Sequence, residues 1–267
     1  MLCQEKLIAE GATELGGRLP VNIDGGLIAN GDSPVVAPIR NRRRSQGWRA
    51  SSDRGSGRST NPPSSGDDDA VLDYDDEAAE YDRTRGGLPR ADAAASALGA
   101  LLPQGGVVLD LAVGTGIVAE RLDSLGHRVI GIDLSTGMLR HAARRLPGRV
   151  ARADATALPL PNDSVAAVTA VWLLHLLDDA EPVLAEVARV LRPGGLFLTT
   201  VDKAAAMRPA GALPPTRIPS DGCALLTALG ARHRLRLSTA TSFLGHGQAR
   251  PGYEDPNYPV LGLRLET

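Results

Sequence analysis

The chain has 267 residues, of which 43% are hydrophobic and 22% charged, as expected of a globular protein large enough for one α/β domain. A net charge of −2 gives no overall attraction to nucleic acid or to an acidic membrane, and 3% aromatic residues argue against a platform for stacking bases. Two cysteines without a CxxC pair or a His/Cys cluster argue against a zinc site, so we expect no metal.

The composition changes near residue 70. Residues 25–69 are rich in Gly, Ser, Pro, Asn and Arg without an apolar period, so we predict that residues 1–70 form a disordered leader. Its basic cluster, Arg40–Arg49, is interpreted as solvated rather than as a nucleic-acid contact, and an acidic stretch, Asp67–Glu77, follows it. No apolar run approaches the roughly 20 residues of a membrane span, and Glu5 and Lys6 do not fit a signal peptide. We therefore expect a cytoplasmic enzyme.

From residue 71 onward, short apolar runs alternate with segments of helical spacing. The predicted helices cover residues 74–84, 90–101, 115–125, 135–146, 179–191 and 221–229, with Ser135 as an N-cap. The predicted strands cover residues 107–111, 128–132, 149–153, 165–172, 196–201, 235–238 and 260–265. This alternation predicts one α/β domain over residues 71–267, with a Rossmann-like, doubly wound and mostly parallel seven-stranded sheet and helices on both faces. Ligands of such sheets bind at the carboxyl ends of the strands.

The segment VVLDLAVGTG, Val107–Gly116, is the strongest motif. A buried strand leads into a turn in which Gly114 and Gly116 allow a ligand to approach the backbone, and the following helix directs free N–H groups at that ligand. The segment also fits a dinucleotide fingerprint, Gly114-x-Gly116-x-x-Ala119, which is weak by itself.

Three carboxylates stand at the ends of three successive strands. Asp110 would repel a pyrophosphate and attract the ammonium and sulfonium of S-adenosylmethionine, unless it only caps turn amides. Asp133, 19 positions after Gly114 (133 − 114), can accept both hydroxyls of a ribose, or can act as a turn or N-cap acid. Asp154 could accept a hydrogen bond from an adenine amine, with the Ala155 amide close to the ring.

These segments resemble class I S-adenosylmethionine-dependent methyltransferases, particularly the small-molecule group with a type 11 methyltransferase domain. The matching segments are Leu109–Gly116, Val129–Ala142, Ala151–Ser164 and Leu174–Thr200. The resemblance implies that the last strand is antiparallel and that eight residues contact the cofactor. Asp110, Ala112, Gly114 and Gly116 would surround its methionine part, Asp133 its ribose, Met138 its adenine ring, and Asp154 and Ala155 its adenine amine.

The sequence departs from the family at two places. Ala112 stands where the family often has a further glycine, and alanine is acceptable there if its φ is negative. Val165 and Ala166 stand where Phe and Asp are frequent, which removes one possible hydrogen-bond partner.

A sulfonium methyl group is already activated, so the protein mainly orients the reactants and excludes water. A base is needed only if the acceptor must lose a proton. His175, after the fourth strand, is the first acid/base candidate, and packing at a helix start is the equal alternative. His246, between two glycines, is the second, although its loop could simply turn the chain. Tyr74 and Tyr81 could form a lid, or only pack their helix, and Trp172 is expected in the core.

We therefore predict an enzyme that transfers a methyl group from S-adenosylmethionine to a small-molecule acceptor. An NAD(P)-dependent oxidoreductase is the first alternative, but Asp110, the Asp154 segment and the lack of a Tyr-x-x-x-Lys pair oppose it. A non-catalytic S-adenosylmethionine-binding protein is the second. A nucleic-acid methyltransferase is disfavoured because there is no dense basic stripe and no site motif for a flipped base.

Overall fold

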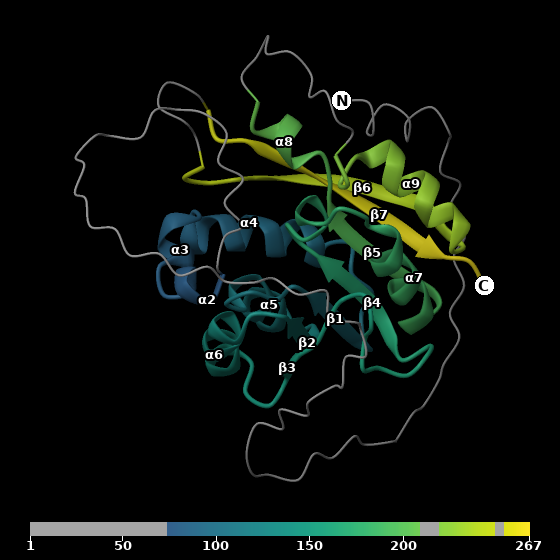
Figure 1. The fold of residues 1–267 in the computed structure, drawn as a ribbon, viewed down its shortest axis with the longest axis horizontal. Helices are drawn as coiled ribbons and strands as arrows, with labels where there is room; N and C mark the ends of the chain where they lie inside the picture. Colours follow the sequence, from purple (N-terminus) through teal and green to yellow (C-terminus); the bar gives the residue numbers. More distant parts are fainter. Residues whose placement is uncertain (1–73, 209–218, 249–253) are drawn as a thin grey trace, which may run out of the picture.

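The computed structural model describes residues 74–208, 219–248 and 254–267 (Figure 1). The predicted leader, residues 1–70, lies outside the described residues. The helices are α2 (Tyr74–Glu77), α3 (Tyr81–Thr84), α4 (Gly87–Gly99), α5 (Ile117–Ser124), α6 (Thr136–Arg145), the 3-10 turn η1 (Leu174–Leu176), α7 (Glu181–Val190), α8 (Lys203–Ala206) and α9 (Cys223–Arg232). Within these ranges, no helix has the length and apolarity that crossing a bilayer requires.

The strands form one seven-stranded sheet. They are β1 (Val107–Leu111), β2 (Arg128–Asp133), β3 (Val150–Arg152), β4 (Val165–Ala170), β5 (Leu191–Thr200), β6 (Leu235–Leu244) and β7 (Asn257–Leu265). Their order is β3-β2-β1-β4-β5-β7-β6, with β1 to β5 paired in parallel and β7 antiparallel to β5 and β6. The predicted α/β class and the antiparallel last strand are confirmed. The strand order reverses between β1 and β4, so a ligand is expected at their carboxyl ends.

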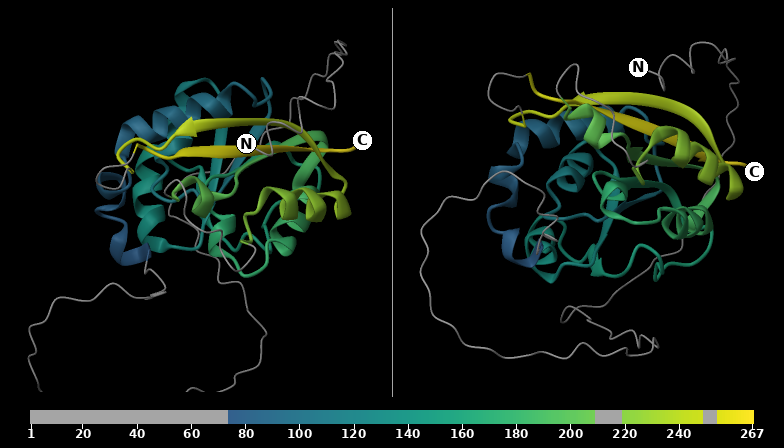
Figure 2. Two further views of the ribbon diagram at one scale, coloured as in Figure 1. Left: turned by 90° about the horizontal axis from the view of Figure 1, so that it is seen from above. Right: turned by 45° about the horizontal axis from the view of Figure 1, so that its top comes forward.

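Helices cover both faces of the sheet, as predicted. Side chains of α4, α5 and α6 pack with Val108 in one core, whereas those of α7 and α9 pack with Leu109 and Leu111 in the other. This division follows from the alternation of neighbouring side chains along β1. Figures 1 and 2 show the two layers, with α2 and α3 at the outer end of the layer that contains α5 and α6.

Several boundaries differ from the predicted ones. The predicted helix over 74–84 is divided into α2 and α3, and η1 and α8 were not predicted. Strand β5 begins at Leu191 instead of residue 196, because a bulge between the pairs Val165–Leu191 and Ala167–Leu196 accommodates the Pro-Gly-Gly sequence. Strand β6 is six residues longer than predicted, ending at residue 244 rather than 238 (244 − 238). Its polar middle, which pairs with β7, gives no apolar alternation.

The conformation of Ala112 contradicts the expectation of a negative φ, since its φ is +53°. The turn is fixed on either side by β2: the Val113 amide donates to the carbonyl of Ile132 at 3.0 Å, and the Gly114 amide donates to Asp133 at 2.8 Å. These two bonds hold a left-handed residue at a position where a Cβ is unfavourable.

Ala112→Gly is expected to leave the free energy of unfolding unchanged or to raise it by up to about 0.5 kcal/mol. Relief of the left-handed Cβ contact, roughly 1 kcal/mol, offsets the greater entropy of glycine in the unfolded chain. Ala143→Gly, on the exposed face of α6, is the matched control and should lower the free energy of unfolding by about 0.5–1 kcal/mol. Urea unfolding measures both, and an equal loss in the two variants would contradict the strained conformation.

Candidate active site

The loop between β1 and α5 lies at the switch point of the sheet. Gly114 and Gly116 have φ values of +57° and +78°. A Cβ at Gly114 would have no non-adjacent neighbour nearer than 4.0 Å, whereas a Cβ at Gly116 would approach Ala142 of α6 to 3.1 Å. Gly116 therefore permits close packing between α5 and α6, while Gly114 leaves space in which a ligand can approach the backbone.

Asp133, the last residue of β2, joins this loop to the second strand. Its Oδ2 accepts the N–H of Gly114 at 2.8 Å, and its Oδ1 accepts the N–H of Ser135 at 2.8 Å. Burial raises the pKa of Asp133, and the amide hydrogen bonds oppose that shift. The N-cap of α6 is Ser135, whose Oγ accepts the N–H of Met138 at 3.0 Å. Asp133 therefore orders the glycine loop and does not serve as the helix cap.

Asp110 lies within β1 and is 4% exposed. Its Oδ1 accepts the hydroxyl of Thr169 on β4 at 2.6 Å, so the carboxylate does not cap the turn. Burial raises the pKa of Asp110 to about 7, Thr169 opposes this shift, and the charge of Asp133 adds to it. None of these three influences comes from a cation.

The pair Asp110 and Asp133 defines what this edge of the sheet can bind. The buried carboxylate of Asp110 and the partly buried carboxylate of Asp133 repel each other, so they gain from a positively charged ligand and would repel a pyrophosphate. These two carboxylates therefore fit the ammonium and sulfonium of S-adenosylmethionine better than they fit NAD.

Asp154 and Ala155 follow β3, the strand next to β2. Asp154 is exposed, and its Oδ1 accepts the backbone N–H and the hydroxyl of Thr156 at 2.9 and 2.8 Å. Met138, in the first turn of α6, is 2% exposed. The structure thus brings Asp110 and Asp133 together at the glycine loop, whereas the Asp154 carboxylate forms a local turn.

Helix α2 docks on the N-terminus of α6 through Asp75. Its Oδ1 accepts the N–H of Gly137 at 2.7 Å and also the hydroxyl of Ser135. A Cβ at Gly137 would lie 2.7 Å from the backbone of Asp75, so this contact requires glycine. In the sequence, Asp75 is only one member of an acidic stretch, and no local pattern distinguishes it.

Helix α3 docks on the glycine loop through Asp82. Its Oδ1 accepts the hydroxyl of Thr115 at 2.6 Å, and its Oδ2 pairs with Arg145 of α6 at 2.7 Å. Arg145 also donates to the carbonyl of Thr115 at 2.7 Å. Asp82 and Arg145 therefore extend the candidate site, and sequence reasoning missed both because their contact joins elements far apart in the chain.

Tyr74 and Tyr81 pack against each other, with ring centroids 6.3 Å apart. Burial raises the pKa of Tyr74, and the charge of Asp133 is among the further causes. Tyr74 therefore lies within electrostatic reach of the loop carboxylate, as a lid would require, although the lid itself stays a prediction.

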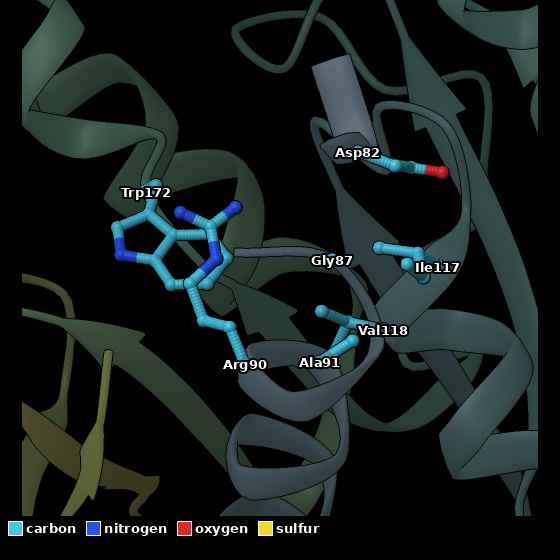
Figure 3. A pocket seen from close by; sticks show the side chains of 7 residues that line it. All are labelled: Asp82, Gly87, Arg90, Ala91, Ile117, Val118 and Trp172. Carbon is cyan, nitrogen blue, oxygen red and sulfur yellow. The ribbon is translucent and has the colours of Figure 1, made fainter. Parts of the chain in front are cut away.

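Trp172 follows β4 and faces the same edge of the sheet. Its φ is +61°, and its backbone N–H donates to Thr200 Oγ1 at 2.8 Å. The guanidinium of Arg90 lies over the indole, 4.0 Å from the ring centroid (Figure 3). The rings of Phe243 and Tyr258 pack against the indole, with centroid-to-centroid distances of 5.6 and 5.8 Å. Trp172 thus packs into the core on one side, as expected, and supports a cation on the other.

A small cavity of about 10 Å³ lies beside this stack, with room for about one water molecule. Its lining comes from α3, α4, α5 and the end of β4, and consists of Asp82, Gly87, Arg90, Ala91, Ile117, Val118 and Trp172 (Figure 3).

His175, in η1, lies 2.7 Å from Lys203 at the start of α8 (Nε2 to Nζ). Burial and the neighbouring ammonium lower the pKa of His175 to about 3, so the imidazole is neutral at neutral pH and accepts from the lysine. Burial, followed by Arg85 and Arg90, lowers the pKa of Lys203 to about 8. Lys203 is thus better matched to proton transfer than His175. It follows the end of β5, so the rule that selected His175 could have found it.

His246 lies in the turn after β6. The space that a Cβ would fill at Gly86 is taken by the carbonyl oxygen of His246, at 2.1 Å. The loop therefore contacts the start of α4 through its backbone, which accounts for a shaped turn without a catalytic role for the imidazole. That role stays untested.

Comparison with known proteins agrees with this geometry. Residues 109–199 match the family model described as a methyltransferase domain. A demethylmenaquinone methyltransferase of Renibacterium salmoninarum is 36% identical over 135 residues, which are 48% of this chain and 56% of that protein. The ubiquinone/menaquinone biosynthesis C-methyltransferase UbiE of Desulfotalea psychrophila is 45% identical over 98 residues, 35% of this chain and 40% of that protein.

The chain therefore spans about half the length of the curated relatives it matches. Among solved structures, a SAM-dependent methyltransferase from Thermotoga maritima is 20% identical, with a TM-score of 0.56, and the match covers 72% of this chain and 98% of that one. At this identity the likeness supports the fold alone. Residues 109–199 are thus similar in sequence to a methyltransferase domain, and the chain shares the fold of the Thermotoga maritima protein.

Proposed function

We propose that this chain binds S-adenosylmethionine at the carboxyl ends of β1 and β2 and transfers its methyl group to a small-molecule acceptor. The observation that carries the proposal is the pair formed by buried Asp110 and partly buried Asp133 beside the open space at Gly114. When bound, the cofactor supplies a methyl group on a cationic sulfur. In this proposal, residues 71–267 form the catalytic domain.

The side chains of this chain would bind the cofactor, orient it toward the acceptor and exclude water. Asp110 faces the positive charge, Asp133 holds the glycine loop and can accept from the ribose, and Met138 and Ala155 lie on the adenine side. Helices α2 and α3 shield the loop through Asp75 and Asp82. The acceptor would lie beside His175 and Lys203, and Lys203 could take a proton from it only above its pKa of about 8.

The acceptor is proposed only as a class. The relatives named demethylmenaquinone methyltransferase make a demethylated menaquinone one compound to test, within a panel of small phenolic, amine and carbon acceptors. We place the enzyme in the cytoplasm and propose no nucleic-acid partner. Release of S-adenosylhomocysteine with any acceptor separates an enzyme from a non-catalytic binding protein.

Binding of S-adenosylhomocysteine is expected in the micromolar range by calorimetry, and NAD should not bind. Asp133→Ala should weaken binding about tenfold or more, since hydrogen bonds to a charged group are lost. Asp92→Ala is the matched control, because this carboxylate is exposed on α4 and pairs with Arg121. Binding of NAD in place of S-adenosylhomocysteine would favour the oxidoreductase alternative.

The pKa of Asp110 predicts that binding depends on pH. The free carboxyl, with a pKa of about 7, is partly protonated at neutral pH, and the ammonium of S-adenosylhomocysteine, which lacks the sulfonium, would lower that pKa and expel the proton. Affinity for S-adenosylhomocysteine should therefore fall below pH 7, by up to about tenfold per unit, and stay level between pH 7.5 and 8.5.

Calorimetry in two buffers of different ionisation enthalpy at pH 6.5 measures the released proton directly. Asp110→Asn should abolish the release whatever its effect on affinity. Wild-type binding without any proton release would show that Asp110 does not face the charge of the ligand.

A further inference from the structure

Three basic side chains converge beyond the cofactor loop, near the ends of β4 and β5. They come from separate elements: Arg85 follows α3, Arg90 lies on α4 and Lys203 begins α8. The Arg90 guanidinium lies 4.0 Å from the ring centroid of Trp172, and Lys203 Nζ lies 2.7 Å from Nε2 of His175, in the same segment after β4. Burial, followed by the charges of Arg85 and Arg90, lowers the pKa of Lys203, in line with this placement.

Carboxylates compensate only part of this charge. Arg85 pairs with Glu77 at 3.3 Å. Asp221 has the weakest effect on the pKa of Lys203, which it raises, and its carboxylate accepts the backbone N–H of Lys203 at 2.9 Å. Arg90, 7% exposed, forms no ion pair with a carboxylate among the residues that the structure describes.

The buried Arg90 and the partly buried Lys203 instead rest on neutral groups. The Arg90 guanidinium lies on the face of Trp172, and the Lys203 ammonium donates to the neutral imidazole of His175. The indole Nε1 of Trp172 is buried and has no hydrogen-bond partner within the described ranges. A desolvated cluster of donors without enough negative charge is unfavourable, and an anion would relieve it.

We infer that the methyl acceptor bears an oxyanion, a carboxylate or a phosphate, which Arg90 and Lys203 hold beside Trp172. This inference rests on the proposed function, because that function places the acceptor on this side of the sheet. A guanidinium stacked on a ring keeps its N–H edge available, so the anion can bind edge-on without separating Arg90 from Trp172.

The backbone at Trp172 supports the same conclusion. A bulky side chain at a φ of +61° is strained, and the hydrogen bond from its N–H to Thr200 Oγ1 holds it there. The strain places the indole under Arg90 at the point where β4 ends. The arrangement therefore positions a cation at the carboxyl edge of the sheet.

The test uses the fluorescence of Trp172 in the full chain. The sequence has two tryptophans, so Trp48→Phe makes Trp172 the only emitter. The protein, saturated with S-adenosylhomocysteine, is titrated with sodium benzoate, with sodium phosphate, and with benzyl alcohol as a neutral analogue of benzoate. Arg90→Met and Lys203→Met remove the cations, and Arg236→Met, an exposed residue paired with Glu266 on the far end of β6, is the matched control.

An anion should bind saturably and benzyl alcohol should not. Arg90→Met and Lys203→Met should each weaken the binding of that anion about tenfold or more, and Arg236→Met should leave its affinity unchanged. Whichever of benzoate and phosphate binds with the higher affinity shows whether the oxyanion is a carboxylate or a phosphate. If Arg90→Met does not fold, Lys203→Met alone decides the question.

Equal binding of benzoate and benzyl alcohol, or anion binding that neither substitution weakens, would overturn the inference. Calorimetry with S-adenosylhomocysteine on each variant separates this failure from that of the proposed function. Loss of cofactor-product binding in the unsubstituted chain would refute the function, whereas intact product binding without anion binding would refute only the oxyanion acceptor.

Discussion

The hydrogen bond between the Asp133 carboxylate and the Gly114 amide is the contact on which the site depends. It joins the end of β2 to the turn after β1, and so fixes a stretch of backbone that a ligand can approach at the switch point. The same contact keeps the partly buried Asp133 near enough to Asp110 for its charge to raise the pKa of Asp110. Local geometry and preference for a cation therefore have a single origin.

Much of the fold and one half of the site follow from local sequence. The buried run before Gly114 and the acids that close successive strands identify the sheet, its ligand edge and the residues Asp110 and Asp133. The contacts of Asp82 with Thr115 and of Lys203 with His175 could not be predicted, because they join elements separated by many residues. The left-handed φ of Ala112 could not be predicted, because it is set by bonds from β2 and not by its own side chain.

The two sides of the site have opposite electrostatic character. The carboxylates of Asp110 and Asp133 lie on the side of β1 and β2, and the cations of Arg90 and Lys203 lie beyond the ends of β4 and β5. Trp172 and Arg90, which α4 contributes, line the small cavity (Figure 3). A cationic donor and an anionic acceptor would each find a complementary surface, and the charges would orient both molecules before any reaction.

The attachment of α2 and α3 has a consequence for exchange of ligands. Between residues 74 and 85, Ala78 is the one apolar side chain that is fully buried among those described, so these helices are held mainly by Asp75 and Asp82. Charge-assisted contacts at a surface weaken as ionic strength rises, whereas the apolar cores on the sheet do not. Salt would thus change how quickly the cofactor enters and leaves while the folded domain keeps its resistance to denaturant.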